Sequence, residues 1–303
     1  TKFLTRPGDI FTLTPLVKYF LSKTPSPYEK ALSVQSRAEQ AQAMHHLLLA
    51  NARAVRNYRE GKFHGKIGIA LNLSPCIDPV TPDSSAANTC SLVHNGWILD
   101  ALYRGVYPAS IESNYRKYAP SFKPSKSEMQ SIMQGRPDFI GVNYYSPTLV
   151  KNDDSQPFGV GNVANSDKFP SYNGPVSPAH MLQLLQWLDK NYDHPEMIIT
   201  ENGAGFGASD ERMGTGVVLD PLRAKYLVGH ADIVEKARAE KINLSGYLFW
   251  SFLDNFEWLF GYQNRFGLVS VNFDDPSLKR TPKSSYFAYK DYISSYKKRN
   301  GCK

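Results

Sequence analysis

The sequence predicts an α/β fold organised around a parallel sheet, and three observations lead to this fold class. Segments with the periodicity of amphipathic helices alternate along the chain with short runs of apolar residues. The stretches between successive apolar runs are long enough to bring the chain back for parallel pairing. Four of these runs are clear enough to count as buried strands. A parallel sheet of four strands could be half of an eight-stranded barrel.

The four expected strands share the composition of buried strands. Each is rich in β-branched, aromatic or other apolar residues and is bounded by polar residues, glycine or proline. They cover Lys66–Leu73, Asp138–Tyr145, Met197–Thr200 and Leu244–Phe252. The third run leads directly into Glu201, which is expected to be the last residue of its strand, and then into a tight turn.

Six segments are expected to be helices. Arg37–Glu60 is the clearest, because its apolar residues recur at helical spacing and Gly61 ends it. Asp220 is expected to cap a helix that begins with Pro221 at its first position. The other expected helices are Ser85–Leu102, Ser127–Gln134, Ala179–Asn191 and Lys283–Tyr296. The segments 150–175 and 203–216 are rich in glycine and polar residues and are expected to be long loops.

The first part of the chain fits this alternation poorly. Residues 1–36 are expected to form an irregular segment before a single domain over residues 37–303. Ile10–Val17 alternates like a strand, although Pro15 confines it to a sheet edge. The start at Thr1, without a signal-peptide core, suggests a chain that is processed, cut or incomplete there. No apolar run reaches the roughly 20 residues that a membrane-spanning helix needs, so no membrane association is expected.

Several classes of function are excluded by what the sequence lacks. The net charge is +7, but the lysines and arginines are scattered and form no basic stripe, so nucleic-acid binding is not expected. Gly203–Gly207 has the spacing G-x-G-x-G rather than G-x-G-x-x-G, which argues against a dinucleotide cofactor. The chain has no Gly-x-Ser-x-Gly motif for a serine hydrolase. No cofactor and no metal site are expected.

The cysteines leave two alternatives for the compartment. The chain has three cysteines at irregular spacing, and free thiols in a cytoplasmic protein are the favoured interpretation. Cys76 and Cys90 could pair if the compartment is oxidising. Two glycosylation sequons begin at Asn72 and Asn243. Both lie against expected strands, so they are interpreted as chance matches.

Candidate functional residues lie at the ends of three expected strands, where α/β folds place their chemistry. Glu201 alone favours a structural carboxylate paired with a lysine or arginine over a catalytic one. Alternation sends Asn143 and Tyr145 to one side, where a phenol can hydrogen-bond a carboxylate; a purely structural role is the alternative. Trp250–Trp258 combines aromatic rings with carboxylates such as Glu257, a combination suited to a polar ligand with an apolar face, such as a sugar.

Several motifs in register resemble those of glycoside hydrolase family 1, the β-glucosidase family. They are Thr200-Glu-Asn-Gly203, Asn143-Tyr-Tyr145, Trp250-Ser-Phe-Leu-Asp-Asn-Phe-Glu-Trp258, Ala43-Met-His-His-Leu, Lys66-Ile-Gly-Ile, Gly105-Val-Tyr-Pro108, Asp138-Phe-Ile-Gly141, Arg265-Phe-Gly267 and Lys283-Ser-Ser. The resemblance covers roughly residues 38–296. It implies a (β/α)8 TIM barrel, of which this chain would carry the last four to five βα units.

The resemblance also implies an activity, that of a retaining β-glycosidase. Glu201 matches the catalytic nucleophile, and Tyr145 matches the tyrosine that hydrogen-bonds it. The positions that match substrate-binding residues of the family are Asn143, Trp250, Glu257, Trp258 and Phe266. Phe256-Glu-Trp258 stands where family members for phosphorylated sugars usually show a Ser/Lys/Tyr set. An unphosphorylated β-glucoside or related β-glycoside is therefore the expected substrate.

The chain departs from the family pattern at the acid/base residue. The family carries this residue in an Asn-Glu-Pro motif, and the motif is absent here, as are the first four strands. A missing N-terminal barrel half is therefore a candidate partner. The alternative is a truncated or inactive relative that binds a sugar or a protein partner.

Overall fold

The structure is a computed structural model that describes residues 34–164, 171–207 and 211–301 of the 303-residue chain. It divides into two compact units. One comprises the described residues up to Gly141 together with Thr148–Ala164, and the other comprises Val142–Pro147 and the described residues from 171 onward. The expected strand Ile10–Val17 and the expected irregular segment up to residue 33 lie outside the described residues.

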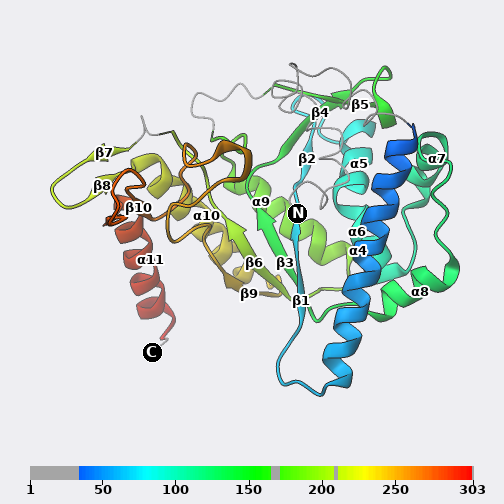
Figure 1. Cartoon of the computed structure of the whole chain (residues 1–303), viewed down its shortest axis with the longest axis horizontal. Helices are drawn as coiled ribbons and strands as arrows, with labels where there is room; N and C mark the ends of the chain where they lie inside the picture. Colours follow the sequence, from blue (N-terminus) through cyan, green and yellow to red (C-terminus); the bar gives the residue numbers. More distant parts are fainter. Residues whose placement is uncertain (1–33, 165–170, 208–210, 302–303) are drawn as a thin grey trace. The chain divides into compact units, whose positions relative to one another are not determined.

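The central sheet has the four strands that the sequence predicts. Their order is β1 (Gly68–Asn72), β3 (Phe139–Tyr144), β6 (Met197–Asn202) and β9 (Leu244–Tyr247) (Figure 1). β6 and β9 pair in parallel, as expected. Ile140, Val142 and Tyr144 on β3 are all fully buried, which explains why this strand reads as a nearly continuous apolar run.

Two strand ends differ from expectation, and both differences concern the candidate site. β6 continues one residue past Glu201, to Asn202. β9 ends at Tyr247 rather than Phe252, although the backbone beyond it still donates to β6, from Leu248 N to Ile199 O (2.7 Å) and from Trp250 N to Asn202 O (2.9 Å). These bonds bring Trp250 next to the carboxyl end of β6. A cis peptide bond follows between Trp250 and Ser251.

The helices of the first unit largely match the expected segments. They are α4 (Val34–Glu60), α5 (Ser85–Ser91), α6 (Trp97–Arg104), α7 (Ala109–Tyr118) and α8 (Lys126–Gln134). The single helix expected over 85–102 is interrupted by a π-helical turn, η2 (Leu92–Gly96). α7 was not expected, because only Ile111 of this helix is buried and no apolar stripe marks it.

A small sheet completes the first unit. It contains β2 (Cys76–Ile77), β4 (Thr148–Asn152) and β5 (Val160–Asn162), and the turn η3 (Pro157–Gly159) lies between the last two. The expected loop 150–175 was therefore wrong in its first part, which forms an antiparallel hairpin. Asn152 holds the hairpin to α5, since its Oδ1 accepts from Ala86 N at 2.9 Å and from Ser85 Oγ at 2.8 Å.

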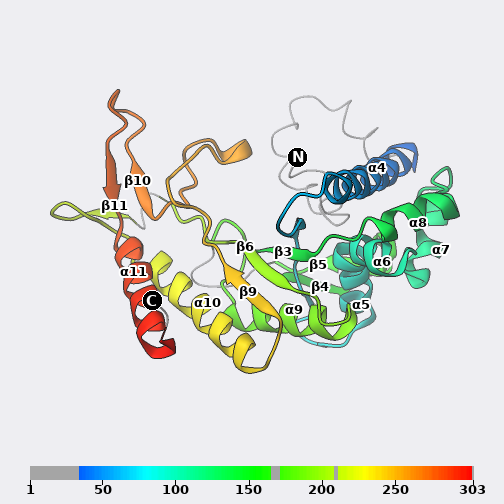
Figure 2. The ribbon, with the colours of Figure 1, turned by 90° about the horizontal axis from the view of Figure 1, so that it is seen from below.

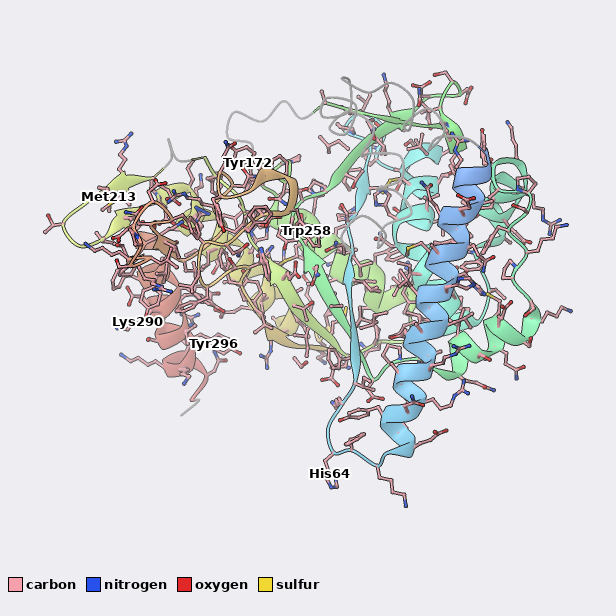
Figure 3. The ribbon with its side chains drawn as sticks, in the orientation of Figure 1. His64, Tyr172, Met213, Trp258, Lys290 and Tyr296 are labelled. Carbon is pink, nitrogen blue, oxygen red and sulfur yellow. A yellow bond between two sulfur atoms is a disulfide. The ribbon has the colours of Figure 1, made fainter. Side chains whose placement is uncertain are left out.

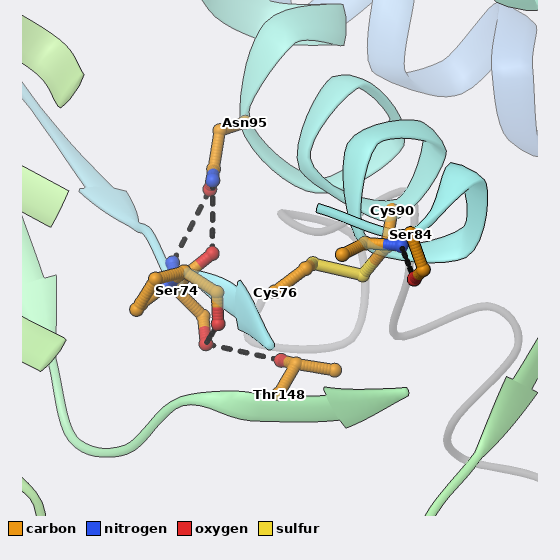
Figure 4. Close-up of a disulfide and its surroundings, with 8 residues drawn as sticks. Ser74, Cys76, Ser84, Cys90, Asn95 and Thr148 are labelled. Atoms are coloured by element: carbon orange, nitrogen blue, oxygen red, sulfur yellow. Dashed lines mark hydrogen bonds between the residues drawn. A yellow bond between two sulfur atoms is a disulfide. The ribbon is translucent and has the colours of Figure 1, made fainter. Parts of the chain in front are cut away.

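The expectation of free thiols at Cys76 and Cys90 is wrong. The two residues form a disulfide, with their Cα atoms 5.8 Å apart, that joins β2 to α5 (Figure 4). Pairing requires two cysteines to approach with their Cβ atoms facing each other. That approach depends on how β2 packs against α5, which a spacing of 14 residues in the sequence does not reveal.

Three helices of the second unit lie side by side, α9 (Pro178–Asn191), α10 (Pro221–Ala239) and α11 (Ser284–Asn300), as Figures 1 and 2 show. Two hairpins accompany them, β7 (Arg212–Met213) with β8 (Val218–Leu219) and β10 (Val269–Val271) with β11 (Arg280–Pro282). Met213 on the first hairpin is 77% exposed (Figure 3). The expected loop 203–216 therefore contains the short strand β7 and ends in the turn between β7 and β8.

Asp220 does not cap α10 as expected. It stands at the N-cap position, but its side chain makes no capping hydrogen bond. The carboxylate instead accepts from Ser285 Oγ at 2.6 Å and from Arg223 Nε at 3.0 Å. The partners come from α11 and from within α10, so Asp220 joins two helices instead of closing one.

No helix among the described residues combines the length and the apolar character that a membrane crossing would require.

The buried ring of His230 on α10 predicts a loss of stability in mild acid. Burial lowers the pKa of His230 to about 4, against an ordinary value of 6.5. Nδ1 lies 2.7 Å from the carbonyl oxygen of Tyr226 and must donate to it. The imidazole ring also stacks on the Tyr226 ring, with the two ring centroids 3.9 Å apart. Protonation would therefore place a charge at Nε2, which is buried and has no hydrogen-bond partner among the described residues.

The unfolded chain binds this proton more tightly than the folded chain. The stabilising contribution is therefore complete above pH 6.5 and is lost as the pH falls towards about 4. We expect the free energy of unfolding to fall by roughly 2 kcal/mol between pH 7 and pH 5 through this group. Urea unfolding at both pH values measures it. A His230→Phe variant keeps an aromatic ring and should lose this part of the pH dependence; an unchanged slope would contradict the assignment.

Candidate active site

Glu201 and Tyr145 meet at the carboxyl ends of neighbouring strands. Glu201 lies on β6, and Tyr145 directly follows β3. The Tyr145 hydroxyl donates to Glu201 Oε2, and the Tyr145 side chain is only 4% exposed. Burial raises the pKa of Tyr145 well above its ordinary value, and the negative charges of Glu201 and Glu257 raise it further. The phenol therefore stays protonated and remains a donor to the carboxylate across the usual pH range.

A second layer of buried polar groups holds these two strand ends together. Asn202 Nδ2 donates to the carbonyl oxygen of Tyr144 and to the hydroxyl of Tyr226, both at 2.9 Å. The Tyr226 hydroxyl donates in turn to the carbonyl oxygen of Tyr145 at 3.0 Å. Tyr247 on β9 donates to Asn202 Oδ1 at 2.7 Å. The amide of Asn202 is thus satisfied on both sides, and it ties β3, β6, β9 and α10 directly behind Glu201.

Asn143 is fixed to the same strand as Glu201. Its Oδ1 accepts from Thr200 Oγ1 at 2.6 Å, and the residue is 8% exposed. Because Thr200 immediately precedes Glu201, this bond keeps Asn143 close to the end of β6. Asn143 and Tyr145, expected on one side of their strand, bond to Thr200 and Glu201, two consecutive residues of β6.

Trp250 and Phe266 approach the turn after Glu201 so closely that only glycine fits. A Cβ atom on Gly203 would lie 1.8 Å from the carbonyl oxygen of Trp250, and one on Gly205 would lie 2.7 Å from the ring of Phe266. Phe266 is 2% exposed and meets the ring of Tyr145 edge to face, with centroids 6.2 Å apart. Phe266, which we call the aromatic wall of the candidate site, is therefore in contact with the Tyr145 ring that holds Glu201.

Glu257 and Trp258 are adjacent in a loop but differ in exposure. Glu257 is 5% exposed, and its backbone N donates to Gly261 O at 2.8 Å. Trp258 begins the turn η5 (Trp258–Phe260) and is 44% exposed (Figure 3). Tyr145 thus contacts both Glu201 and Phe266, whereas the Trp258 side chain is largely exposed.

A buried cluster of charges lies beneath these loops. Lys283 is fully buried, and its Nζ donates to Glu211 and, at 2.9 Å, to Asp254 Oδ1. The same Asp254 oxygen accepts from Gly267 N at 2.9 Å. Burial, aided by the nearby Arg223 charge, lowers the pKa of Lys283, and the two carboxylates oppose that effect. The cluster therefore fixes the loop that follows Phe266.

Arg223 extends the cluster to the turn after Glu201. It is fully buried, and its Nη1 donates to the carbonyl oxygens of Ala204 and Arg265, both at 2.8 Å. Its Nη2 donates to Glu211 Oε1 at 2.9 Å. Because Ala204 lies three residues after Glu201, Arg223 holds both the turn after the carboxylate and the segment that carries Phe266.

Sequence reasoning missed the residues of this second layer. Asn202 was visible only as the residue after Glu201, and Tyr226 only as part of an apolar helix face. Lys283 was visible only as part of a motif that resembles the family and had no assigned role. Their importance depends on contacts between segments 24 to 81 residues apart, and no local pattern signals such contacts.

The Tyr145 hydroxyl leads to a testable prediction for the reaction that the family resemblance implies. Replacing Tyr145 with Phe removes one donor to a carboxylate and leaves the ring packed on Phe266. Because Tyr145 holds Glu201 in one orientation, and a displacement of a reacting group by about 1 Å can cost about 100-fold in rate, we expect kcat/KM for an activated aryl β-glucoside to fall roughly 10- to 100-fold. Steady-state kinetics measures it. Tyr296→Phe on α11 is the matched control and should leave kcat/KM unchanged; equal rates for Tyr145→Phe and the unmodified chain would exclude this role.

Comparison with known proteins identifies the family. The sequence matches glycosyl hydrolase family 1 over residues 16–298. Beta-glucosidase A of Acetivibrio thermocellus is 36% identical over 258 residues, which are 83% of this chain and 56% of that protein. Beta-glucosidase A of Thermotoga maritima is also 36% identical over 258 residues, with 84% of this chain and 56% of that protein covered. The chain thus spans about half the length of these curated relatives.

Solved structures agree with the sequence matches. The family 1 β-glucosidase of Exiguobacterium antarcticum superposes with a TM-score of 0.78 at 32% identity, covering 86% of this chain and 58% of that one. The Thermotoga maritima β-glucosidase in complex with castanospermine superposes with a TM-score of 0.76 at 34% identity. The match covers 86% of this chain and 57% of that one. The predicted TIM-barrel family and the predicted match to the C-terminal part are both confirmed. The chain belongs to glycosyl hydrolase family 1 and corresponds to the C-terminal part of its β-glucosidases.

Proposed function

We propose that this chain carries the nucleophile half of a retaining β-glycosidase that acts on terminal, unphosphorylated β-D-glucosides or related β-glycosides. The observation that carries the proposal is the carboxylate of Glu201 at a strand end, held by the buried hydroxyl of Tyr145 beside the aromatic wall of Phe266. A carboxylate held in this way can attack with a fixed orientation.

The two oxygens of Glu201 would have different tasks. Oε2 accepts from Tyr145, so Oε1 is left to attack the anomeric carbon of the sugar. The bond between that carbon and the leaving oxygen breaks as the new ester bond forms. Water then attacks the anomeric carbon of the glycosyl ester, and Glu201 leaves as a carboxylate again. Two displacements at one carbon give overall retention of configuration.

The neighbouring residues suit a neutral sugar. The indole of Trp250, beside the end of β6, would stack on the apolar face of the ring. The hydroxyl groups of the sugar would form hydrogen bonds with Asn143, Glu257 and Trp258. A phosphate on the sugar would meet the like charge of the Glu257 carboxylate, which disfavours phosphorylated substrates.

The second carboxylate of the mechanism is not supplied by an Asn-Glu-Pro motif in this chain. Retaining enzymes place it about 5–5.5 Å from the nucleophile, where it protonates the leaving group. Because the chain spans about half of its relatives, we assign this group to a further barrel segment, carried by the same protein or by a partner. Acid catalysis contributes typically about 10²–10⁴-fold, so natural glycosides should react slowly with this chain alone.

Azide rescue tests the proposal without the missing acid. A dinitrophenyl β-glucoside needs little protonation of its leaving group, so the glycosyl ester should form, and azide should replace water in the second step. We expect faster turnover with azide and a β-glucosyl azide product. If the chain binds the sugar but yields neither turnover nor glucosyl azide, the inactive, sugar-binding alternative holds instead.

A further inference from the structure

The structure separates the two glycosylation sequons, which sequence alone could not. Asn243 of the second sequon is exposed in the turn between α10 and β9, and Ser245, on β9, is also exposed, with its hydroxyl donating to Met197 O at 3.3 Å. Asn72 of the first sequon is half-buried on β1, and its Oδ1 is buried. Ser74 is 2% exposed, and its hydroxyl bonds to Thr148 Oγ1 at 3.0 Å (Figure 4). Only the second sequon can carry a bulky group on the folded chain.

The side chain of Asn243 can be modified without losing a buried contact. Its Nδ2 donates to His194 O at 3.4 Å, and His194 is itself exposed. An N-linked Asn keeps one N–H, so this weak bond survives modification. The backbone carbonyl of Asn243 accepts from Met197 N at 2.8 Å, which fixes the turn independently of the side chain. Glu240 and Lys241, just before the sequon, are also exposed.

A glycan at this position would lie away from the candidate active site. Asn243 directly precedes β9, and Met197 begins β6 beside it. The two strands are parallel, so Glu201 and Trp250 lie towards their opposite, carboxyl ends. Glu201 lies four positions after Met197 along the strand, a distance of about 13 Å. A glycan on Asn243 would therefore not block access to Glu201.

The disulfide points to the compartment in which sequons are used. Disulfides such as Cys76–Cys90 persist in oxidising compartments and are rare in the cytosol. The lumen of the eukaryotic secretory pathway is such a compartment, and N-x-S/T sequons are modified there. The expectation of a cytoplasmic protein depended on free thiols at Cys76 and Cys90, and these two residues form a disulfide. The expectation of chance sequons depended on their position against strands, and Asn243 is nevertheless exposed.

We infer that Asn243 is an N-glycosylation site of this protein and that Asn72 is not. The donor is an oligosaccharide linked to a lipid pyrophosphate, and a transferase of the secretory pathway catalyses the step. Nδ2 of Asn243 attacks the anomeric carbon of the donor, and the N–C bond forms. The bond from that carbon to the pyrophosphate oxygen breaks, the lipid pyrophosphate leaves with the electron pair, and Nδ2 gives its proton to the enzyme's base.

The test is the mass of the full chain after passage through a eukaryotic secretory pathway. The secreted and the retained chain are both collected, and each is measured before and after treatment with peptide N-glycosidase. We expect a loss of mass on treatment and conversion of Asn243, but not Asn72, to Asp in the peptide map. A chain without glycan at Asn243, or with glycan at Asn72, would overturn the inference.

Matched variants make the result independent of folding defects. Asn243→Gln and Ser245→Ala should each abolish the mass loss, whereas Asn72→Gln should keep it. Ser245→Thr preserves the sequon and should also keep it. Loss of the glycan in Ser245→Thr, or its persistence in Asn243→Gln, would contradict the assignment. None of these residues belongs to the candidate active site, so the outcome is separate from the proposed glycosidase function.

Discussion

Glu201→Gln is expected to reduce hydrolysis of a dinitrophenyl β-glucoside to the uncatalysed background. Removing a covalent nucleophile typically costs on the order of 10⁶-fold in rate, because no other group can form the intermediate. The amide oxygen of Gln can still accept from Tyr145, so the fold should be preserved. Initial rates and a urea unfolding curve together distinguish lost chemistry from lost structure.

Glu240→Gln is the matched control for this substitution. Glu240 is exposed at the end of α10 and accepts from Gln186 Nε2 at 2.7 Å. Its neutralisation should leave the rate unchanged. If Glu201→Gln and Glu240→Gln both hydrolysed the substrate at the rate of the unmodified chain, Glu201 would be a structural carboxylate and the proposed mechanism would be wrong.

Lys283→Met is expected to cause the largest loss of stability of any single substitution proposed for this chain. The change leaves the carboxylate of Asp254 buried, with its nearest remaining cation, Arg265 Nη1, at 3.8 Å from Oδ2. Breaking a buried ion pair by removing one partner costs about 3–5 kcal/mol, because the other charge stays desolvated. Folded domains have only about 5–15 kcal/mol of stability in total, so this loss should be obvious in urea unfolding.

Two further variants sharpen this prediction. Lys297→Met removes an exposed charge from α11, the helix that Lys283 precedes, and should change the free energy of unfolding by less than about 0.5 kcal/mol. Asp254→Asn in the Lys283→Met background removes the stranded charge and should recover part of the loss. If Lys283→Met and Lys297→Met changed the free energy of unfolding equally, the buried charge cluster would not contribute to stability.

The sheet could be predicted because its signals are local. Each strand is an apolar run with clear ends, and α4 has a long helical periodicity ended by Gly61. α7 and the hairpin of β4 and β5 were missed because they bury few apolar residues and so lack a strong pattern. The π-helical turn at Leu92–Gly96 has no signature that distinguishes it from the helix on either side.

The sequence predicted the residues at the strand ends of the candidate site but not the buried polar residues that hold them in place. Glu201, Asn143 and Tyr145 could be placed because strand ends and alternation determine where such side chains point. Arg223 could not, because the same residue on an amphipathic helix is normally exposed. Its burial follows from carbonyl oxygens at Ala204 and Arg265 that only the folded chain brings together.

The most direct test of the central claim is covalent labelling of Glu201. A 2-fluoro β-glucoside with an activated leaving group forms the glycosyl ester but slows its hydrolysis, and it needs no acid catalyst. We predict an added mass of one fluoroglucosyl group per chain, located by peptide mapping on Glu201 and absent in Glu201→Gln. An unlabelled chain, or a label on another residue, would contradict the account.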